Sequence, residues 1–154
     1  MTNHELLVSA IKNGTVIDHI AAGQALKIIR ILRLPDHKKV VTLGLNLPSR
    51  AMGHKDLIKV EGRELTPEEA NEVALLAPEA SINIIKNYKV TKKFRVRIPE
   101  MIERVIVCPN AKCITNHERM MTVFFVRQQG KLLKLQCKYC EKIFGQGEIG
   151  DYNL

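Results

Sequence analysis

The sequence predicts an α+β protein whose N-terminal part is a ferredoxin-like antiparallel sheet with two helices on one face. Before Pro99, strand-like and helix-like runs follow one another in the order β-α-β-β-α-β, with an extra strand. After Pro99 the chain changes to short strand-like runs separated by two pairs of cysteines, which is typical of a small all-β domain. We therefore expect two domains, at residues 1–98 and 99–154.

The first strand is predicted at 6–11, where an apolar run ends at the Asn13-Gly14 turn signal. A second strand-like run follows at 15–20. From 22 to 34, polar residues recur at every third position and apolar residues fill the other side. This period predicts an amphipathic helix, and Pro35 is expected to end it.

The second helix has a strong start signal. Thr66 can act as the N-cap, Pro67 occupies the first helical position, and Glu69 completes a capping box. We expect this helix to end at Pro78.

The remaining strands are predicted from shorter apolar patterns bounded by turn residues, with a loop at 48–53. They lie at 39–47, 57–60, 81–85 and 88–97 in the first domain, and at 105–107, 121–126 and 131–135 in the second.

The composition is that of a globular protein. Of the 154 residues, 45% are hydrophobic and 26% are charged, which is far from the balance of a disordered chain. No apolar run approaches the roughly 18 residues that a membrane span needs. The N-terminus lacks a basic stretch leading into an apolar core, so no secretory signal is predicted. We expect a cytoplasmic protein with no membrane partner.

The four cysteines have the spacing of a metal site. Cys108 and Cys113 form a C-x4-C pair, and Cys137 and Cys140 form a C-x2-C pair. Two such turns can aim four thiolates at one point, which is the tetrahedral cage that Zn²⁺ prefers. Because all four ligands come from the protein, no position stays open for water, and one structural zinc ion per chain is predicted. The second domain is therefore a small all-β zinc-binding domain.

Other interpretations of the cysteines are less favoured. Two disulfides or free thiols are less common in a reducing cytosol than a metal site, and iron could occupy the same cage as a redox centre. A zinc deaminase needs a ligand-x-Glu element and a Pro-Cys-x-x-Cys element, whereas here Glu118 directly follows His117 and Gln136 precedes Cys137. A thioredoxin-like redox role for Cys137 and Cys140 is not favoured, because both cysteines are predicted metal ligands.

The net charge of +8 lies mainly in the first domain. Residues 1–99 carry a net charge of +6 and residues 100–154 carry +2, which four thiolates and a zinc ion would make roughly neutral. One basic run contains no acid: Lys86, Lys89, Lys92, Lys93, Arg95 and Arg97. This run is either a solvated strand face or an anion site. In an unbroken strand, period 2 would place four of these side chains on one side: Lys89, Lys93, Arg95 and Arg97.

Four stretches resemble the regulatory chain of aspartate carbamoyltransferase. They occur in the right order and with the zinc spacing intact: NGTVIDHI at 13–20, GLNLPS at 44–49, KDLIK at 55–59 and CKYCEK at 137–142. The likeness covers nearly the whole chain. It implies a non-catalytic subunit of pyrimidine biosynthesis whose N-terminal domain binds nucleotide effectors, with CTP as inhibitor, ATP as activator and UTP acting with CTP.

The resemblance also implies roles for individual residues. His19 and Lys93 match the family's phosphate contacts, Asp18 would accept hydrogen bonds from ribose hydroxyls, and Lys59 would lie by the ribose and the base. The full predicted nucleotide set is Ile11, Asp18, His19, Ser49, Lys55, Lys59, Asn83, Ile85, Tyr88, Val90 and Lys93. Two positions depart from the best-known members: Glu5 stands in place of a lysine and Ser9 in place of a glutamate. In those members the lysine belongs to the accessory nucleotide site, so its replacement bears on whether UTP acts together with CTP.

The implied partners are a second copy of the chain, bound through the N-terminal domain, and the catalytic chain, bound through the zinc domain. The implied holoenzyme contains two catalytic trimers and three regulatory dimers. Polar residues fixed beside the cysteine turns are the predicted contacts with the catalytic chain: Asn110, Lys112, Lys138, Tyr139, Glu141 and Lys142.

Two alternative functions belong to other classes. A nucleic-acid-binding zinc protein would agree with the net charge, but the basic residues avoid the cysteine segment and aromatic residues make up only 5% of the chain. A free-standing metalloenzyme is disfavoured by the closed cage. We expect no nucleic-acid partner and no catalytic activity of the chain alone.

Overall fold

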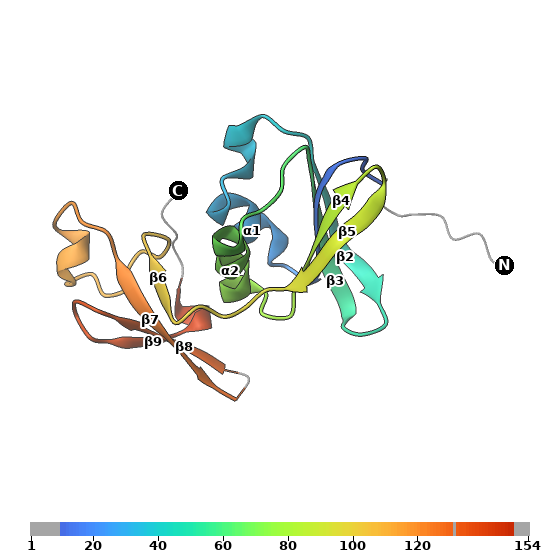
Figure 1. Cartoon of the computed structure of the whole chain (residues 1–154). Coiled ribbons are helices and arrows are strands. Elements are labelled where there is room, and N and C mark those ends of the chain that lie inside the picture. Colours follow the sequence, from blue (N-terminus) through green and yellow to red (C-terminus); the bar gives the residue numbers. More distant parts are fainter. Residues whose placement is uncertain (1–9, 131, 150–154) are drawn as a thin grey trace. The chain divides into compact units, whose positions relative to one another are not determined.

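The computed structural model describes residues 10–130 and 132–149 and divides the chain into two compact units, Met1–Arg97 and Ile98–Leu154. Each unit has its own sheet (Figure 1). The strand predicted at 6–11 lies mostly outside the described residues, as do Glu5 and Ser9, and its last two residues, Ala10 and Ile11, are not in a strand.

The first unit is built on a five-stranded antiparallel sheet in the order β2-β3-β1-β4-β5. Its central strand, β1 (Gly14–Ala21), pairs with β3 (Gly53–Glu61) on one side and β4 (Ser81–Lys86) on the other. The outer strands are β2 (Val41–Ser49) and β5 (Lys89–Arg95). The first four strands have the ferredoxin-like order, and β5 is the extra strand. The predicted fold class is confirmed.

Gly14 begins β1, after a bend at Lys12 and Asn13. Its φ is +142°, and a Cβ at this position would lie 2.0 Å from the carbonyl oxygen of Val60. Only glycine therefore allows β1 and β3 to approach each other this closely at their ends.

The two helices, α1 (Ala25–Ile31) and α2 (Pro67–Leu76), lie next to each other on one side of the sheet (Figure 1). Helix α2 begins as the sequence predicts. The Thr66 hydroxyl accepts from the Glu69 N–H, and the Glu69 carboxylate accepts from the Thr66 N–H, each at 3.2 Å. This capping box satisfies two amides that no helical carbonyl can reach.

Helix α1 is shorter than predicted, and Pro35 does not end it. Arg33 has a left-handed φ of +51°, which stops the helix two residues earlier, and Pro35 lies inside a short 3₁₀ turn, η1 (Leu34–His37). At the N-terminus, the predicted start at 22 is wrong because Ala22 and Gly23 form a turn. The side chain of Asp56, from β3, accepts hydrogen bonds from the amides of Gly23 and Ala25.

The core of the first unit lies between this sheet face and the helices. Ile17, Ile58 and Ile82 pair across the three central strands and are fully buried. Ile28 of α1 and Val73 of α2 are fully buried as well. Burial of each such side chain contributes about 1.5–3 kcal/mol. The core therefore lies on one face of the sheet, and the opposite face is not covered by the two helices.

The second unit is a four-stranded antiparallel sheet in the order β6-β7-β8-β9. Its strands are β6 (Met101–Glu103), β7 (Val123–Gln129), β8 (Leu132–Cys137) and β9 (Ile143–Gly145), with 3₁₀ turns η2 (Ile114–Asn116) and η3 (Gln146–Glu148). Phe124, Leu135 and Cys137 are fully buried on one sheet face. Cys137 is therefore part of the apolar core on this sheet face.

The strand predicted at 105–107 is wrong. Arg104 has a φ of +70°, which ends β6 before this segment. Ile106 is still fully buried, and the Thr122 hydroxyl donates to its carbonyl at 2.5 Å. None of the helices in the described part of the chain has the length and apolar character needed to cross a membrane.

Candidate functional site

The sheet face opposite the helices carries a row of polar side chains in register. Val16 of β1 pairs with Lys59 of β3 and with Asn83 of β4, and Asn83 pairs with Lys93 of β5. Residues directly opposite each other in antiparallel strands point to the same face. Lys59, Asn83 and Lys93 therefore line one face, spread over three strands. The Asn83 amide donates to the Val16 carbonyl at 3.3 Å, which fixes its orientation.

A second cluster lies on β1 where its pairing with β3 shifts register between Ile17 and Ile20. Here the Asp18 carboxylate contacts the Lys55 ammonium at 2.8 Å and accepts from the His19 N–H at 2.7 Å. His19 has a left-handed φ of +56°, so its side chain departs from the strand alternation. Its Nδ1 lies 3.2 Å from the Ser81 hydroxyl of β4. The bulge thus brings the Asp18 carboxylate, the His19 imidazole and the Lys55 ammonium close to one another.

Asp18 is held in its ionised form. Burial alone would raise its pKa, but the hydrogen bond from Lys55, the His19 N–H and the nearby positive charges outweigh that effect, so the pKa lies below its ordinary value. A carboxylate in this state can accept two hydrogen bonds from a diol.

This shift predicts an acid-dependent stability. Because the folded pKa of Asp18 is below its unfolded value, its contribution is present above the unfolded pKa of about 3.9 and is lost as the pH falls through the folded pKa. The Asp18→Asn variant should therefore lose stability mainly above pH 4 and approach the parent protein below it. Urea unfolding between pH 2.5 and pH 6 measures this convergence, and a constant difference across that range would contradict it.

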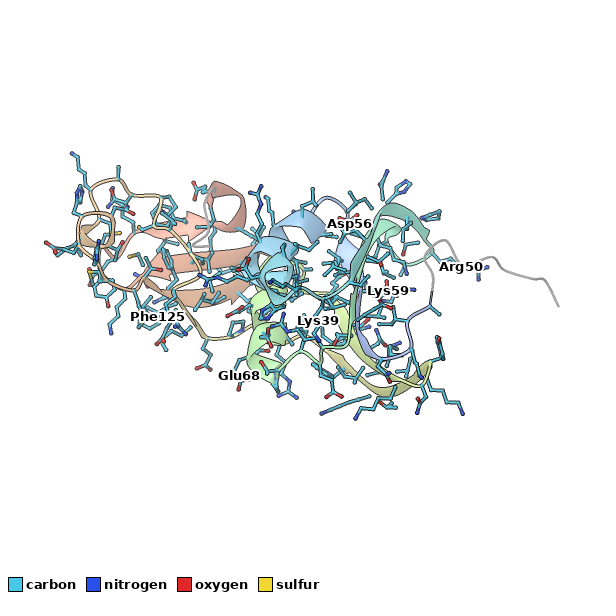
Figure 2. The ribbon with its side chains drawn as sticks, turned by 90° about the horizontal axis from the view of Figure 1, so that it is seen from above. Lys39, Arg50, Asp56, Lys59, Glu68 and Phe125 are labelled. Atoms are coloured by element: carbon cyan, nitrogen blue, oxygen red, sulfur yellow. The ribbon has the colours of Figure 1, made fainter. Side chains whose placement is uncertain are left out.

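Lys59 is buried in the middle of the face, with 8% of its surface exposed. Figure 2 labels Lys59 and Asp56, which lie on the same strand, β3. Burial lowers the pKa of Lys59, and the charge of Asp18 opposes this only in part. Burial disfavours the charged form of an ammonium, and an anion bound close to it would favour that form.

The other predicted nucleotide residues lie around this face. Ile11 is buried just before β1, and Ile85 is buried in β4 beside the exposed Val90 of β5. Tyr88 is exposed in the β4–β5 turn, and its N–H donates to the Lys12 carbonyl, which brings this turn beside Ile11. Ser49 lies at the β2–β3 turn, where its hydroxyl accepts from the Met52 N–H.

The basic strand is not unbroken, and this changes which cations share a face. Lys92 pairs with Ile84 but Val90 pairs with Ile85, so Thr91 is an extra residue in a β-bulge. The bulge puts Lys89 on the helix side, whereas Lys93 and Arg95 face away from it. The predicted grouping of Lys89 with Lys93 is therefore wrong.

Sequence reasoning missed one member of the polar face, Ser81, which contacts His19. Arg95 pairs with Ser81 across β4 and β5, so it shares this face with Lys93, as the period of the basic run predicts. Nothing local marks Ser81, because its role depends on the register of β1 against β4.

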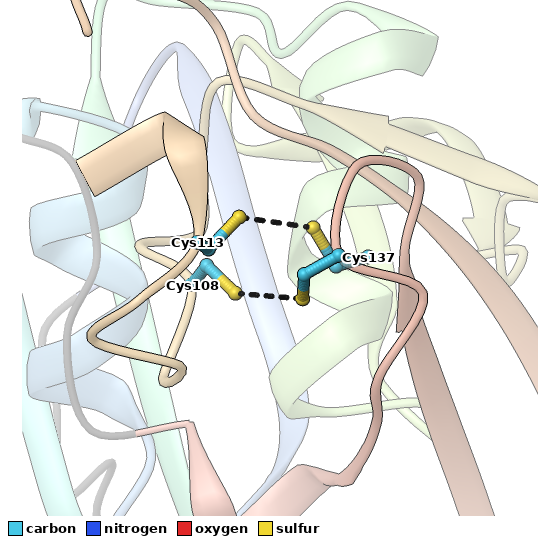
Figure 3. A group of neighbouring side chains, drawn as sticks. Cys108, Cys113 and Cys137 are labelled. Atoms are coloured by element: carbon cyan, nitrogen blue, oxygen red, sulfur yellow. Dashed lines mark hydrogen bonds between the residues drawn. The ribbon is translucent and has the colours of Figure 1, made fainter. Parts of the chain in front are cut away.

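The four cysteines come together in the second unit. Their sulfur atoms lie within 4.8 Å of one another, with Cys108 3.8 Å from Cys140 and Cys113 3.7 Å from Cys137 (Figure 3). A disulfide would require about 2.05 Å. A tetrahedral ion with metal–sulfur distances of about 2.3 Å separates its sulfurs by about 3.8 Å. The donor set therefore fits one metal ion and does not fit two disulfides.

Burial and local hydrogen bonds shift the pKa values of the cysteine thiols in opposite directions. Burial raises the pKa of the Cys108 and Cys137 thiols. It would raise that of Cys113 as well, but the hydroxyl and amide of Thr115 lower it to about 7. The Thr115 hydroxyl lies 3.1 Å from the Cys113 sulfur. A cation at the centre would remove the cost of four closely spaced, mutually repelling thiolates.

The residues predicted to contact a partner lie on the two turns that carry the cysteines. Asn110 accepts from the Lys112 N–H, and the Glu141 N–H donates to the Cys137 carbonyl. Lys138 lies over the Tyr139 ring at 5.9 Å. Lys112, Lys138, Tyr139, Glu141 and Lys142 are exposed, and Asn110 is half-buried. The backbone of these residues belongs to the same two turns that position the sulfur atoms.

Two family models match consecutive parts of the chain. The model described as aspartate carbamoyltransferase regulatory chain, allosteric domain, matches residues 6–97. The model described as the metal binding domain of the same regulatory chain matches residues 100–150. The first match contains the polar sheet face and the second contains all four cysteines.

Curated relatives agree along the whole length. The chain is 51% identical over 147 residues to a protein of Pyrococcus abyssi, covering 94% of this chain and 96% of the relative. It is 48% identical over 144 residues to one of Chromobacterium violaceum, with 94% and 95% covered, and 44% identical over 148 residues to one of Aeromonas salmonicida, with 96% of both covered. Each relative is named aspartate carbamoyltransferase regulatory chain.

Proposed function

The chain belongs to the family of aspartate carbamoyltransferase regulatory chains, and we propose that it binds the nucleotide effectors CTP, ATP and UTP and thereby modulates the catalytic chains of pyrimidine biosynthesis. It is a regulatory, non-catalytic subunit with an allosteric domain and a metal-binding domain. The observation that carries the nucleotide proposal is the in-register row of Lys59, Asn83 and Lys93 beside the Asp18–Lys55 pair.

The chemistry of this face suits a nucleoside triphosphate. Lys93 and His19 would bind the phosphates, because charge-assisted hydrogen bonds to phosphate are strong. Asp18 would accept from the ribose hydroxyls, as carboxylates do in other nucleotide sites. Lys59 would lie by the ribose and base, and Lys55 and Ser49 would complete the polar side. Ile11, Asn83, Ile85, Tyr88 and Val90 would line the slot for the base.

Replacing the phosphate ligands should weaken every triphosphate alike. Lys93→Ala and His19→Ala are each expected to reduce CTP and ATP affinity about 10- to 100-fold, because a charge-assisted hydrogen bond is worth about 1.5–3 kcal/mol. Isothermal titration calorimetry on the purified chain measures both affinities. Lys89→Ala is the matched control, because Lys89 lies on the same strand but on the opposite face. Equal losses in the Lys89 and Lys93 variants would refute the assignment.

Replacing Lys59 is expected to weaken nucleotide binding. Lys59→Met should reduce the affinity by at least tenfold, because the proposed site loses a cation that would lie by the ribose and the base. Calorimetry gives the affinity, and thermal unfolding of the free chain verifies that the variant folds. An affinity within twofold of the parent's would contradict the assignment.

We propose Zn²⁺ as the bound metal, one ion per chain. Four thiolates with tetrahedral spacing and no open position are typical of structural zinc. Elemental analysis of metal-replete protein should give one zinc per chain, and a ratio near zero or a stoichiometric iron content would contradict the assignment.

The regulatory chain's partner is proposed to be a catalytic chain, docked on Asn110, Lys112, Lys138, Tyr139, Glu141 and Lys142. A second copy would pair through the N-terminal domain, giving a cytoplasmic holoenzyme of two catalytic trimers and three regulatory dimers. The domains proposed for these roles are 1–98 for nucleotides and 99–154 for zinc and docking. Co-purification of a catalytic chain with this one, with a sedimentation mass matching that assembly, tests both contacts.

A further inference from the structure

A cleft of about 590 Å³ lies on the helix side of the first unit, between the start of α2 and the end of β5. This volume is in the range of small-molecule sites. Its lining residues all belong to the first unit: Pro67, Asn71, Lys92, Phe94, Arg95, Val96 and Arg97. The polar face described above is on the other side of the sheet, because Phe94 pairs with the core residue Ile82 and Lys93 pairs with Asn83.

The cleft combines an aromatic wall with positive charge. Phe94 is half-buried, and the Lys92 ammonium lies 5.8 Å from the centre of its ring. Lys92 and Arg97 are exposed, and no acidic residue lines the cleft. Arg95 also lines the cleft, although its pairing with Ser81 places its side chain on the polar face. Within the described residues, the salt bridges of this chain involve neither Lys92 nor Arg97. Two unneutralised charges in one concave site attract an anion.

The apolar part of the lining decides what kind of anion fits. Pro67, Phe94 and Val96 offer a hydrophobic surface, and Asn71 offers an amide. A small inorganic anion would leave this surface in contact with water. A flat ring could cover Phe94 while its charged group reaches Lys92 or Arg97.

We propose that this cleft binds an aromatic anion, meaning a ligand with a flat ring system and a phosphate, sulfonate or carboxylate group. The ring packs against Phe94 and Val96, and the anionic group is bound by Lys92 and Arg97. This site is separate from the nucleotide face and does not depend on the function proposed above.

The test uses the full chain without nucleotide and 1-naphthyl phosphate as the probe. Titration followed by ¹H–¹⁵N NMR should show saturable shifts of the Asn71 and Phe94 amides, with a Kd below about 1 mM. Inorganic phosphate and neutral 1-naphthalenemethanol should each bind at least tenfold more weakly. Arg97→Gln should weaken binding about threefold and reduce its salt dependence, and Phe94→Leu should weaken it by loss of the aromatic wall.

Lys89→Gln is the control, because it removes a cation from the same strand that does not line the cleft. Unchanged binding in this variant supports the proposal. Two results would overturn it: no saturable shift up to 10 mM probe, or an equal loss of affinity in the Lys89 and Arg97 variants. Because Arg97 is exposed, its variant is expected to fold, and unchanged thermal unfolding verifies this.

Discussion

Removal of the metal from the four-cysteine cage is expected to release catalytic trimers that remain active but no longer respond to CTP or ATP. The four sulfurs hold together two turns on which the proposed docking residues lie. A unit of this size buries too little apolar surface to fold securely alone, and structural zinc contributes about 10–16 kcal/mol of coupled folding energy. A mercurial that captures the thiolates provides the removal, and size-exclusion chromatography with activity assays provides the readout.

Single variants make the same test without a chemical reagent. Cys140→Ala should lose the metal and unfold the second unit, while the far-UV signal of the first unit and its nucleotide binding largely persist. Cys140→His is the matched control, because Cys₃His sites also hold zinc, and it should retain part of the metal. If metal-free chain still assembled with catalytic subunits and transmitted effector control, the metal-binding domain would not be the docking element.

Replacing Asp56 by alanine is expected to cost the first unit about 3–5 kcal/mol. The Asp56 side chain is buried at 1% exposure and accepts three backbone hydrogen bonds. Its donors are the amides of Gly23 at 2.9 Å, Ala25 at 3.2 Å and Asn46 at 2.8 Å. Each amide left without an acceptor costs about 1–3 kcal/mol. The loss should lower Tm by roughly 15–30 °C for a unit of this size.

Two further variants sharpen this prediction. Asp56→Asn should fall between the parent and the alanine variant, because its amide keeps a single acceptor oxygen. Asp36→Ala is the control, since Asp36 is an exposed acid in η1 and should change stability by less than about 0.5 kcal/mol. Calorimetric unfolding of the purified chain measures all three. An Asp56→Ala variant within 1 kcal/mol of the parent would show that the three amides find other acceptors.

The elements that the sequence predicted well are those whose signals are local. Helix α2 starts where Thr66, Pro67 and Glu69 place it, because a capping box needs only four consecutive residues. Helix α1 was predicted too long because the polar and apolar period does not determine where either end lies. Its N-terminal amides are satisfied by Asp56, which lies 31 residues after Ala25, and its C-terminus follows from the left-handed Arg33.

The same distinction applies to the candidate sites. The metal cage could be predicted because cysteines are rare in this chain and their pairwise spacing defines each turn. The polar face could be predicted only in part. The alternation of side chains expected of an unbroken strand does not hold on β5, because the bulge at Thr91 puts Lys89 on the opposite face from Lys93. His19 and Ser81 contact each other although they lie 62 positions apart in the sequence, and no local pattern encodes the register that brings them together.

The position of β1 at the centre of its sheet has a consequence for biosynthesis. This strand is made first and paired late, because its partners β3 and β4 follow in the chain, and β4 ends only at Lys86. At a synthesis rate of about 5–20 residues per second, the apolar face of β1 waits about 3–13 s for β4. During this interval Ile17 and Ile20 depend on chaperones or on transient collapse for protection. The last cysteine, Cys140, is made after all five strands of the first sheet. We therefore expect the nascent chain to acquire its nucleotide face first and its metal last.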